Sequence, residues 1–173
     1  MRLPHLPTPY VSSHARSGSG ELTESALATH RAFYDAVETG DVDLMASLWV
    51  DDPETSCVHP GAMPLRGTAA VLRSWTVLMA NVGYIQFFLT DIDIMTFPPG
   101  GDEPHTAVIT CTENILSGEG LASAGSFTGG KAIATSMLVR DPSTGSGQTA
   151  QWKIWMRHAS PVVDLTQTEG EET

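Results

Sequence analysis

The sequence predicts an α+β fold in which helices come first and pack on one face of a long antiparallel sheet. Before residue 83, apolar residues recur at helical spacing in three segments. From residue 84 onward they alternate as in β-strands, and turn-rich segments such as 141–148 separate the strand patterns. Helices followed by a strand meander are typical of α+β domains.

Three helices are expected in the first half of the chain. The first runs from Thr23, which can cap it, to Gly40, which can end it. The second begins after Asp41 as the capping residue and ends before Pro53, and the third covers residues 68–83. A short strand over 54–59 and a loop over 60–67 separate the second helix from the third.

Four long strands are expected after the helices, over residues 84–97, 105–118, 131–140 and 151–162. The apolar alternation shifts near Thr90 and Asp91, which predicts a bulge or strong bend there. In the last strand, Trp152, Ile154, Met156 and His158 share the more apolar side, which we expect to face the interior. Lys153, Trp155 and Arg157 would then face outward.

Composition indicates a single globular domain with an acidic surface. The chain has 173 residues and a formal net charge of -11, and its nine Lys and Arg residues are scattered, so a nucleic-acid partner is not expected. No segment is apolar for long enough to predict a membrane span. Cys57 and Cys111 lie in apolar runs and are expected to be buried and unpaired, without need of an oxidising compartment.

The two ends of the chain are expected to be disordered. Residues 1–21 form an arm rich in Pro, Ser and Gly, and residues 164–173 form an acidic tail. The arm lacks the apolar stretch of a secretory signal, although its arginines and lack of acidic residues leave a short organelle-targeting peptide open. We expect a cytoplasmic protein whose folded domain covers residues 22–163.

The order of short motifs resembles a known family. These motifs are FYDAVETGDVDLMASLWVDD, then VHPG and LRG opening a helix that contains SW, then four strands ending in WKIWMRHASP. Together they resemble the SnoaL-like branch of the nuclear transport factor 2 and ketosteroid isomerase superfamily. The resemblance implies a cone-shaped, strongly curved antiparallel sheet wrapped on three N-terminal helices, enclosing an apolar cavity, in a protein that is often a homodimer.

The resemblance allows the catalytic positions of ketosteroid isomerases to be located in this sequence. The side chains required for that chemistry are missing from these positions. By position, the family's catalytic tyrosine falls on Phe33, its base on His59 and its second acid near Ser136. A phenyl ring cannot donate a hydrogen bond to a developing oxyanion. The protein is therefore not expected to be a standard ketosteroid isomerase.

His59 and His158 are the candidate catalytic residues. Pro60 favours extended geometry for His59, and burial would lower the pKa of its imidazole and leave a neutral base. Strand alternation directs His158 inward, where it could orient a substrate or water. The resemblance and the apolar pattern together predict a ligand-binding set of Phe33, Trp49, Trp75, Ser136, Trp152 and Met156.

Each of these residues also has a purely structural interpretation. His59 near a proline turn is typical of a hydrogen-bonded structural histidine, and Trp49 and Trp75 lie in helical stripes typical of core residues. Arg66 and Arg73 could recognise an anion but are typical of solvated surface residues. The spacing of His, Cys and acidic residues predicts no metal site, and no cofactor is expected.

Three classes of function remain open. The domain could be a cavity enzyme of isomerase, cyclase or hydrolase type that uses His59 and His158 for acid/base chemistry. It could bind a small, largely apolar molecule without reaction. It could also be a homodimeric interaction module, with Trp155 on the outer sheet face of the interface. Binding of a small molecule, with or without chemistry, is the prediction, and the interaction module is the alternative.

Overall fold

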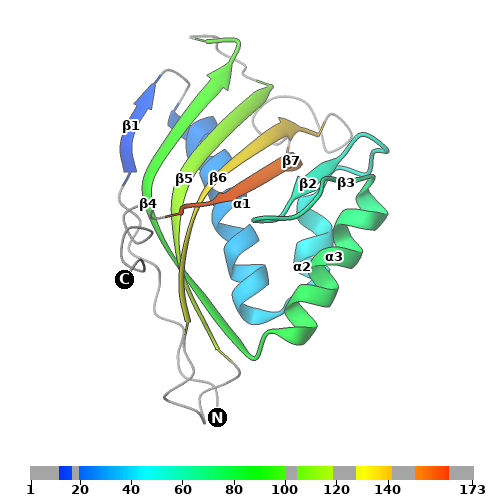
Figure 1. Cartoon of the computed structure of the whole chain (residues 1–173). Coiled ribbons are helices and arrows are strands. Elements are labelled where there is room, and N and C mark those ends of the chain that lie inside the picture. The colour runs from blue at the N-terminus through cyan, green and yellow to red at the C-terminus, as the bar shows by residue number, and fades with distance from the viewer. Residues whose placement is uncertain (1–11, 17–19, 100–104, 119–127, 142–150, 164–173) are drawn as a thin grey trace.

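The computed structural model describes residues 12–16, 20–99, 105–118, 128–141 and 151–163 (Figure 1). In these ranges three helices lie ahead of four long strands, and all strands belong to one seven-stranded sheet. The α+β class predicted from the sequence is therefore confirmed. No helix among the described residues combines the length and the apolar character needed to cross a bilayer.

The helices are α1 (Gly20–Thr39), α2 (Val42–Leu48) and α3 (Thr68–Asn81). α1 starts ahead of the predicted cap Thr23, which is buried inside the helix. Asp41 caps α2 as predicted, because its carboxylate accepts a 2.9 Å hydrogen bond from the backbone N–H of Leu44. Gly40, with φ of 69°, ends α1 in a conformation that favours glycine.

The strands are β1 (Ser12–Arg16), β2 (Ser56–Val58), β3 (Leu65–Arg66), β4 (Tyr84–Phe97), β5 (Thr106–Gly118), β6 (Thr128–Arg140) and β7 (Trp152–Pro161). Their order in the sheet is β1-β4-β5-β6-β7-β2-β3. The four long strands pair antiparallel, as expected, but β1 pairs with β4 and β2 with β7 in parallel. The sheet is therefore mixed. It bends strongly, and its concave side lies against α1 (Figure 1).

The N-terminal segment differs from the expectation of a disordered arm over residues 1–21. Ser12–Arg16 form the edge strand β1, and α1 begins at Gly20. Its sequence, SSHAR, has no apolar alternation from which a strand could be predicted. The predicted tail, 164–173, lies outside the described residues, as do 1–11 and 17–19.

β4 carries the bulge that its sequence predicts. Pairing with β5 is regular up to Thr90 and resumes at Asp93, and Asp91 has a positive φ of 52°. The apolar side chains change parity at this point, since Phe87 and Leu89 are buried before it and Ile92 and Ile94 after it. The bulge keeps the core-facing side of the strand apolar while the strand bends.

A second bulge, in β7, was not predicted. Leu138 of β6 pairs with Ile154, whereas Met137, the residue before it, pairs with Met156. Trp155 is therefore an extra residue in β7. Because each strand residue points to the side opposite its neighbour, one extra residue reverses which side the following residues face.

This reversal corrects the predicted orientation of the last strand. Arg157, expected to face outward, is buried with only 2% of its surface exposed. His158, expected to face inward, is exposed and pairs with Thr135 on the outer side of the sheet. Met156 also lies on the outer side, opposite Met137. The predicted interior positions of Met156 and His158 are therefore wrong.

The core fills the space between the concave side of the sheet and the helices. Its largest fully buried residues include Phe33 of α1, Trp49 after α2 and Ile109 of β5. Cys57 and Cys111 are buried and free, as predicted. This core also buries several polar and charged side chains, which form the candidate site.

Candidate functional site

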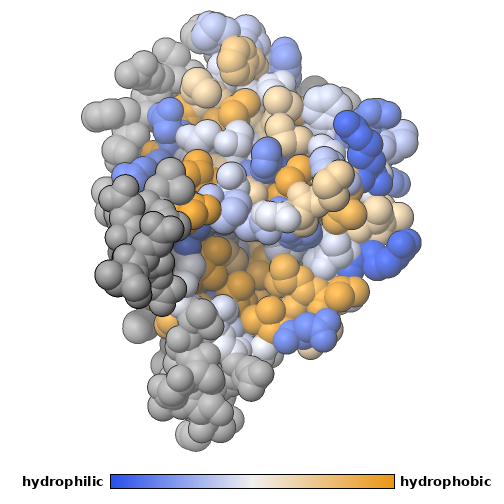
Figure 2. Space-filling model, viewed as in Figure 1, coloured by the Kyte–Doolittle hydropathy of each residue, from blue (hydrophilic) through white to orange (hydrophobic). Residues whose placement is uncertain are grey.

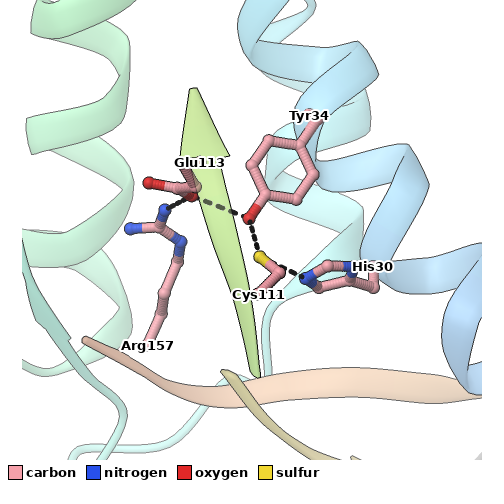
Figure 3. A network of polar contacts seen from close by, with 5 residues as sticks. All are labelled: His30, Tyr34, Cys111, Glu113 and Arg157. Atoms are coloured by element: carbon pink, nitrogen blue, oxygen red, sulfur yellow. Dashed lines mark hydrogen bonds and ion pairs between the residues drawn. The ribbon is translucent and has the colours of Figure 1, made fainter. Parts of the chain in front are cut away.

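An ion pair lies inside the core, between Arg157 of β7 and Glu113 of β5 (Figure 3). Nη2 of Arg157 donates a hydrogen bond to Oε1 of Glu113, and both side chains are almost fully buried, with 2% and 1% exposed. Burial is the largest single effect and lowers the pKa of Arg157, but Glu113, Tyr34 and Cys57 together outweigh it, so the pKa is raised. Each charge therefore depends on the other for its stability inside the protein.

Tyr34 of α1 extends the ion pair into a chain of polar contacts. Its hydroxyl donates a 2.7 Å hydrogen bond to Oε1 of Glu113 and lies 3.4 Å from Sγ of Cys111 (Figure 3). Nε2 of His30 lies 3.9 Å from the same sulfur. Burial raises the pKa of Tyr34 well above 10.0, and the nearby Glu113 raises it further, so the phenol stays protonated as a donor.

Burial also keeps the remaining members of this chain uncharged. The pKa of His30 falls from 6.5 to about 3, through burial first and then through the positive charges of Arg157 and Arg31. Burial raises the pKa of Cys111 to about 11. At neutral pH the polar chain therefore contains a neutral imidazole, a thiol, a phenol and one balanced ion pair.

Aromatic rings cover the guanidinium of Arg157. Cζ of Arg157 lies 4.8 Å from the ring centre of Phe33 and 5.4 Å from that of Trp75. The Phe33 and Trp75 rings meet edge-on, with centres 4.9 Å apart, and the ring centre of Trp49 lies 6.5 Å from that of Phe33. Cation–π contacts of this kind stabilise a desolvated guanidinium.

His59 lies at the edge of this aromatic cluster and is half-buried. It follows β2, and its ring centre is 4.5 Å from that of Trp75. Nε2 of His59 is 2.9 Å from Oγ of Ser74 on α3. Burial lowers the pKa of His59, and the positive charge of Arg157 lowers it further, so both effects favour the neutral imidazole.

Several buried nitrogen atoms around this cluster have no hydrogen-bond partner among the described residues. They include Nε and Nη1 of Arg157, Nε1 of Trp75 and Nδ1 of His59. Cys57 interacts with Arg157 and Trp75, and both lower the pKa of its thiol, although burial has the larger effect and raises it. Sulfur is a weak acceptor, so Cys57 leaves the donors of Arg157 and Trp75 poorly satisfied.

An apolar patch lies on the face of the molecule shown in Figure 2. Hydrophobic residues gather around a hollow over the helices and beside the lower ends of the long strands (Figure 2). Leu78 and Met79 of α3, with Ile85 of β4 and Ile115 of β5, are partly buried hydrophobic residues packed on the core. Leu78 and Met79 follow Trp75 by one helical turn, so all three lie on the same side of α3.

The sequence matches the SnoaL-like domain over residues 26–164, which is most of the chain. The chain belongs to the SnoaL-like family. The resemblance stated from the sequence motifs is therefore confirmed. Among curated proteins, none matches this SnoaL-like chain.

Solved structures place this SnoaL-like domain among nuclear transport factor 2-like folds. A proposed dehydratase of the NTF2-like family from Streptomyces avermitilis has 39% identity and a TM-score of 0.66, with 82% of this chain and 96% of that chain covered. A proposed calcium/calmodulin-dependent protein kinase type II association domain from Thiobacillus denitrificans has 21% identity and a TM-score of 0.61, with coverages of 87% and 100%.

A ketosteroid isomerase-like protein from Erwinia carotovora atroseptica has 12% identity and a TM-score of 0.62, with 84% of this chain and 99% of that chain covered. At identities below 25%, the kinase-association and isomerase-like structures support the fold alone.

The structure brings together some of the residues singled out in the sequence. Phe33, Trp75 and His59 lie around Arg157, and Ser136 is buried on the strand position that pairs with Arg157. Trp49 joins the cluster through Phe33, whereas Trp152 is buried at the far end of β7, beside Arg140 in register. Met156 and His158 lie on the outer side of the sheet and do not join it.

Sequence reasoning missed Tyr34, Glu113 and Arg157. Glu113 shares its alternation with the buried residues Ile109 and Cys111, so its position could have been found from the strand pattern. Arg157 could not, because its inward direction depends on the β7 bulge. Among the described residues, no group of three or more His, Cys, Asp or Glu side chains is arranged to hold a metal ion.

Proposed function

We propose that this SnoaL-like domain binds a small, largely apolar molecule beside Trp75, and that His59 exchanges a proton with the bound molecule. One observation carries the proposal. Nδ1 of His59 is shielded from solvent and has no hydrogen-bond partner among the described residues, while Nε2 is held by Ser74.

The hydrogen bonds of Ser74 indicate which nitrogen of His59 carries the proton. The hydroxyl of Ser74 donates its only hydrogen to the carbonyl oxygen of Val71, at 2.7 Å. Oγ of Ser74 must then accept a hydrogen bond from Nε2–H of His59. In the neutral imidazole this leaves the lone pair on Nδ1, ready to accept a proton from a bound molecule.

Electrostatics support the same role. A general base must be unprotonated at working pH, and both burial and Arg157 lower the pKa of His59. The half-buried ring lies against Trp75, and Leu78 and Met79, one helical turn further along α3, are partly buried hydrophobic residues on the same helix side. The relative from Streptomyces avermitilis, a proposed dehydratase, supports chemistry of the proton-transfer kind.

Solvent deuterium exchange tests the proposal with simple compounds in place of the natural substrate. Cyclic ketones and hydroxylated cyclic compounds are incubated with the protein in D2O, and deuterium uptake into carbon is measured by mass spectrometry. We expect uptake with at least one compound class and its loss in His59→Ala. His105→Ala is the matched control, since His105 is exposed. Undiminished exchange in His59→Ala would remove His59 from the mechanism.

A homodimeric interaction role is the second candidate, and the outer side of the sheet favours it. Met95, Val108, Met137 and Met156 lie in one register row across four strands, beside Trp155 of the β7 bulge. Met95 and Trp155 are 42% and 37% exposed. Contiguous apolar patches on a protein surface often mark protein–protein contacts.

Sedimentation velocity tests this candidate. At micromolar concentration we expect a dimer, and Met95→Lys combined with Trp155→Lys should shift it to a monomer, because two charges would be buried in the interface. A wild-type monomer at these concentrations contradicts the interaction role and leaves the small-molecule proposal intact.

A further inference from the structure

We propose that the molecule bound beside Trp75 carries an uncharged oxygen acceptor, such as a ketone carbonyl, which the free N–H groups of Arg157 and Trp75 recognise. This inference rests on the proposed binding function and specifies its ligand class. It starts from hydrogen-bonding groups that are buried and unused in the protein itself.

The unused groups around the Arg157 guanidinium are donors. Nε and Nη1 of Arg157 and Nε1 of Trp75 are buried without a partner among the described residues. Arginine and the indole nitrogen can only donate hydrogen bonds. A buried donor without an acceptor costs free energy, so a molecule that supplies an acceptor here gains what the protein alone lacks.

The geometry places these donors near one another. The Trp75 ring centre is 5.4 Å from Cζ of Arg157, and Cys57 interacts with both side chains. Cys57 itself is fully buried and pairs in register with Arg157 across β2 and β7. A ligand oxygen that approaches this group would replace a weak sulfur contact with a stronger acceptor.

The charge balance selects an uncharged acceptor over a carboxylate. The positive charge of Arg157 is already matched by Glu113 through a direct hydrogen bond. His59 and His30 are both held toward the neutral form, so neither supplies a further positive charge. A buried ligand carboxylate would therefore bring an unmatched negative charge, which is costly in a low-dielectric interior.

The side chains around these donors are apolar, so the rest of the ligand is expected to be apolar as well. Phe33 and Trp75 flank the guanidinium, and Leu78 and Met79 extend the apolar side of α3 by one helical turn. A ring system would contact these side chains while its oxygen meets the donors. The expected ligand class is thus a cyclic or aromatic ketone rather than a fatty acid or an aromatic acid.

Matched probes that differ at a single atom test the inference. 2-Acetylnaphthalene and 2-isopropenylnaphthalene have the same shape, with a carbonyl oxygen in the first replaced by a CH2 group in the second. Acetophenone and α-methylstyrene form a smaller matched pair, and 2-naphthoate supplies the carboxylate. Isothermal titration calorimetry at pH 8 measures each affinity in the full chain.

We expect the ketone of at least one pair to bind about tenfold or more tightly than its alkene, which is the gain typical of a hydrogen bond to a charged donor. 2-Naphthoate should bind more weakly than 2-acetylnaphthalene. In Trp75→Phe, which keeps the ring and the Arg157–Glu113 pair, the preference for ketone over alkene should fall severalfold. Trp155→Phe, the same change on the outer side of the sheet, should leave the preference unaltered.

The possible contrary results separate this inference from the proposed function. Equal affinities for ketone and alkene would overturn the inference but leave binding of an apolar molecule intact. Tighter binding of 2-naphthoate would overturn the uncharged class. A ketone preference unchanged in both Trp75→Phe and Arg157→Lys would place the acceptor elsewhere and also overturn it. Binding of none of the five probes would contradict both the inference and the binding function.

Discussion

The hydroxyl of Tyr34 donates a 2.7 Å hydrogen bond to Oε1 of Glu113, the same carboxylate oxygen that accepts from Arg157. One oxygen atom thus joins α1, β5 and β7 in the middle of the core (Figure 3). Because all three side chains are buried, none can exchange its partner for water. The contact therefore ties the first helix to the sheet as well as balancing charge.

Tyr34→Phe should destabilise the fold while keeping its packing. The change removes one hydrogen bond to a buried carboxylate, and we expect the free energy of unfolding to fall by about 1.5–3 kcal/mol. Urea denaturation measures it. Tyr84→Phe is the control, since Tyr84 is only half-buried and donates to the neutral side chain of Gln86. Equal losses in the two variants would contradict a special role for the Tyr34 contact.

Glu113→Gln should be more harmful than removal of the whole ion pair. The single change leaves the buried charge of Arg157 unmatched, which typically costs about 3–5 kcal/mol. In the double variant Glu113→Gln with Arg157→Met no buried charge remains, so we expect part of this stability to return. A double-mutant cycle by chemical denaturation measures the coupling. Strictly additive losses would show that the two charges do not stabilise each other.

His30 should make the fold sensitive to acid. Its pKa in the folded protein is lowered from 6.5 to about 3, so between these values the unfolded chain binds a proton that the folded protein does not. Stability from this residue is complete above pH 6.5 and is lost as the pH falls toward 3.

Comparison of wild type with His30→Gln isolates this effect. The wild-type free energy of unfolding should fall more steeply on acidification, by up to about 1.4 kcal/mol per pH unit for one proton. Urea denaturation at intervals between pH 4 and 7 gives both curves. Parallel curves would mean that His30 is protonated in the folded state as readily as in the unfolded chain.

The pH profile of deuterium exchange should report the lowered pKa of His59. The free-base form that the proposed proton transfer needs persists below the ordinary pKa of 6.5, so exchange should continue below pH 6.5 and be lost as the pH falls further. On the acidic side of the pH profile, the exchange rate should fall at a lower pH than the pH at which free imidazole in solution becomes protonated. A fall above pH 6.5 would contradict the burial of the His59 ring.

Ser74→Ala should disturb the proton position on His59. Without Oγ as acceptor, the Nε2–H tautomer loses its stabilising hydrogen bond, and the Nδ1–H tautomer should gain population. Long-range 15N–1H NMR correlations distinguish the two forms, and deuterium exchange should fall severalfold. Thr76→Ala is the matched control, because Thr76 lies on the same helix but donates to the carbonyl of Leu72 on an exposed side.

Much of the fold follows from local patterns in the sequence. The apolar stripes of three helices, the cap at Asp41 and the parity shift near Asp91 each depend on residues close together in the chain, and the structure confirms all three. The parallel pairings of β1 with β4 and of β2 with β7 depend on contacts distant in sequence. Local patterns carry no information on those partners, so the parallel pairings could not be predicted.

The candidate site was predictable in part, for the same reason. Phe33 and His59 were singled out by their positions in the resemblance, and Trp75 by its apolar helical stripe, and the three meet around Arg157. Arg157 itself was assigned to the wrong side, because it shares the parity of the polar Lys153, whereas Trp152, Ile154 and Met156 share the other parity. That alternation describes a regular strand, whereas the pairing with β6 inserts an extra residue at Trp155.

The extra residue at Trp155 also affects how relatives of this domain are compared. Before Trp155, the inward-facing residues of β7 have even numbers, as Trp152 and Ile154 do. After it, the inward-facing residues have odd numbers, as Arg157 and Ala159 do. A relative whose last strand lacks this insertion would carry the counterpart of Arg157 at the position aligned, without a gap, to Met156. Surveys of this family for the buried guanidinium must therefore allow a one-residue gap in the final strand, or they will compare a core cation with a surface side chain.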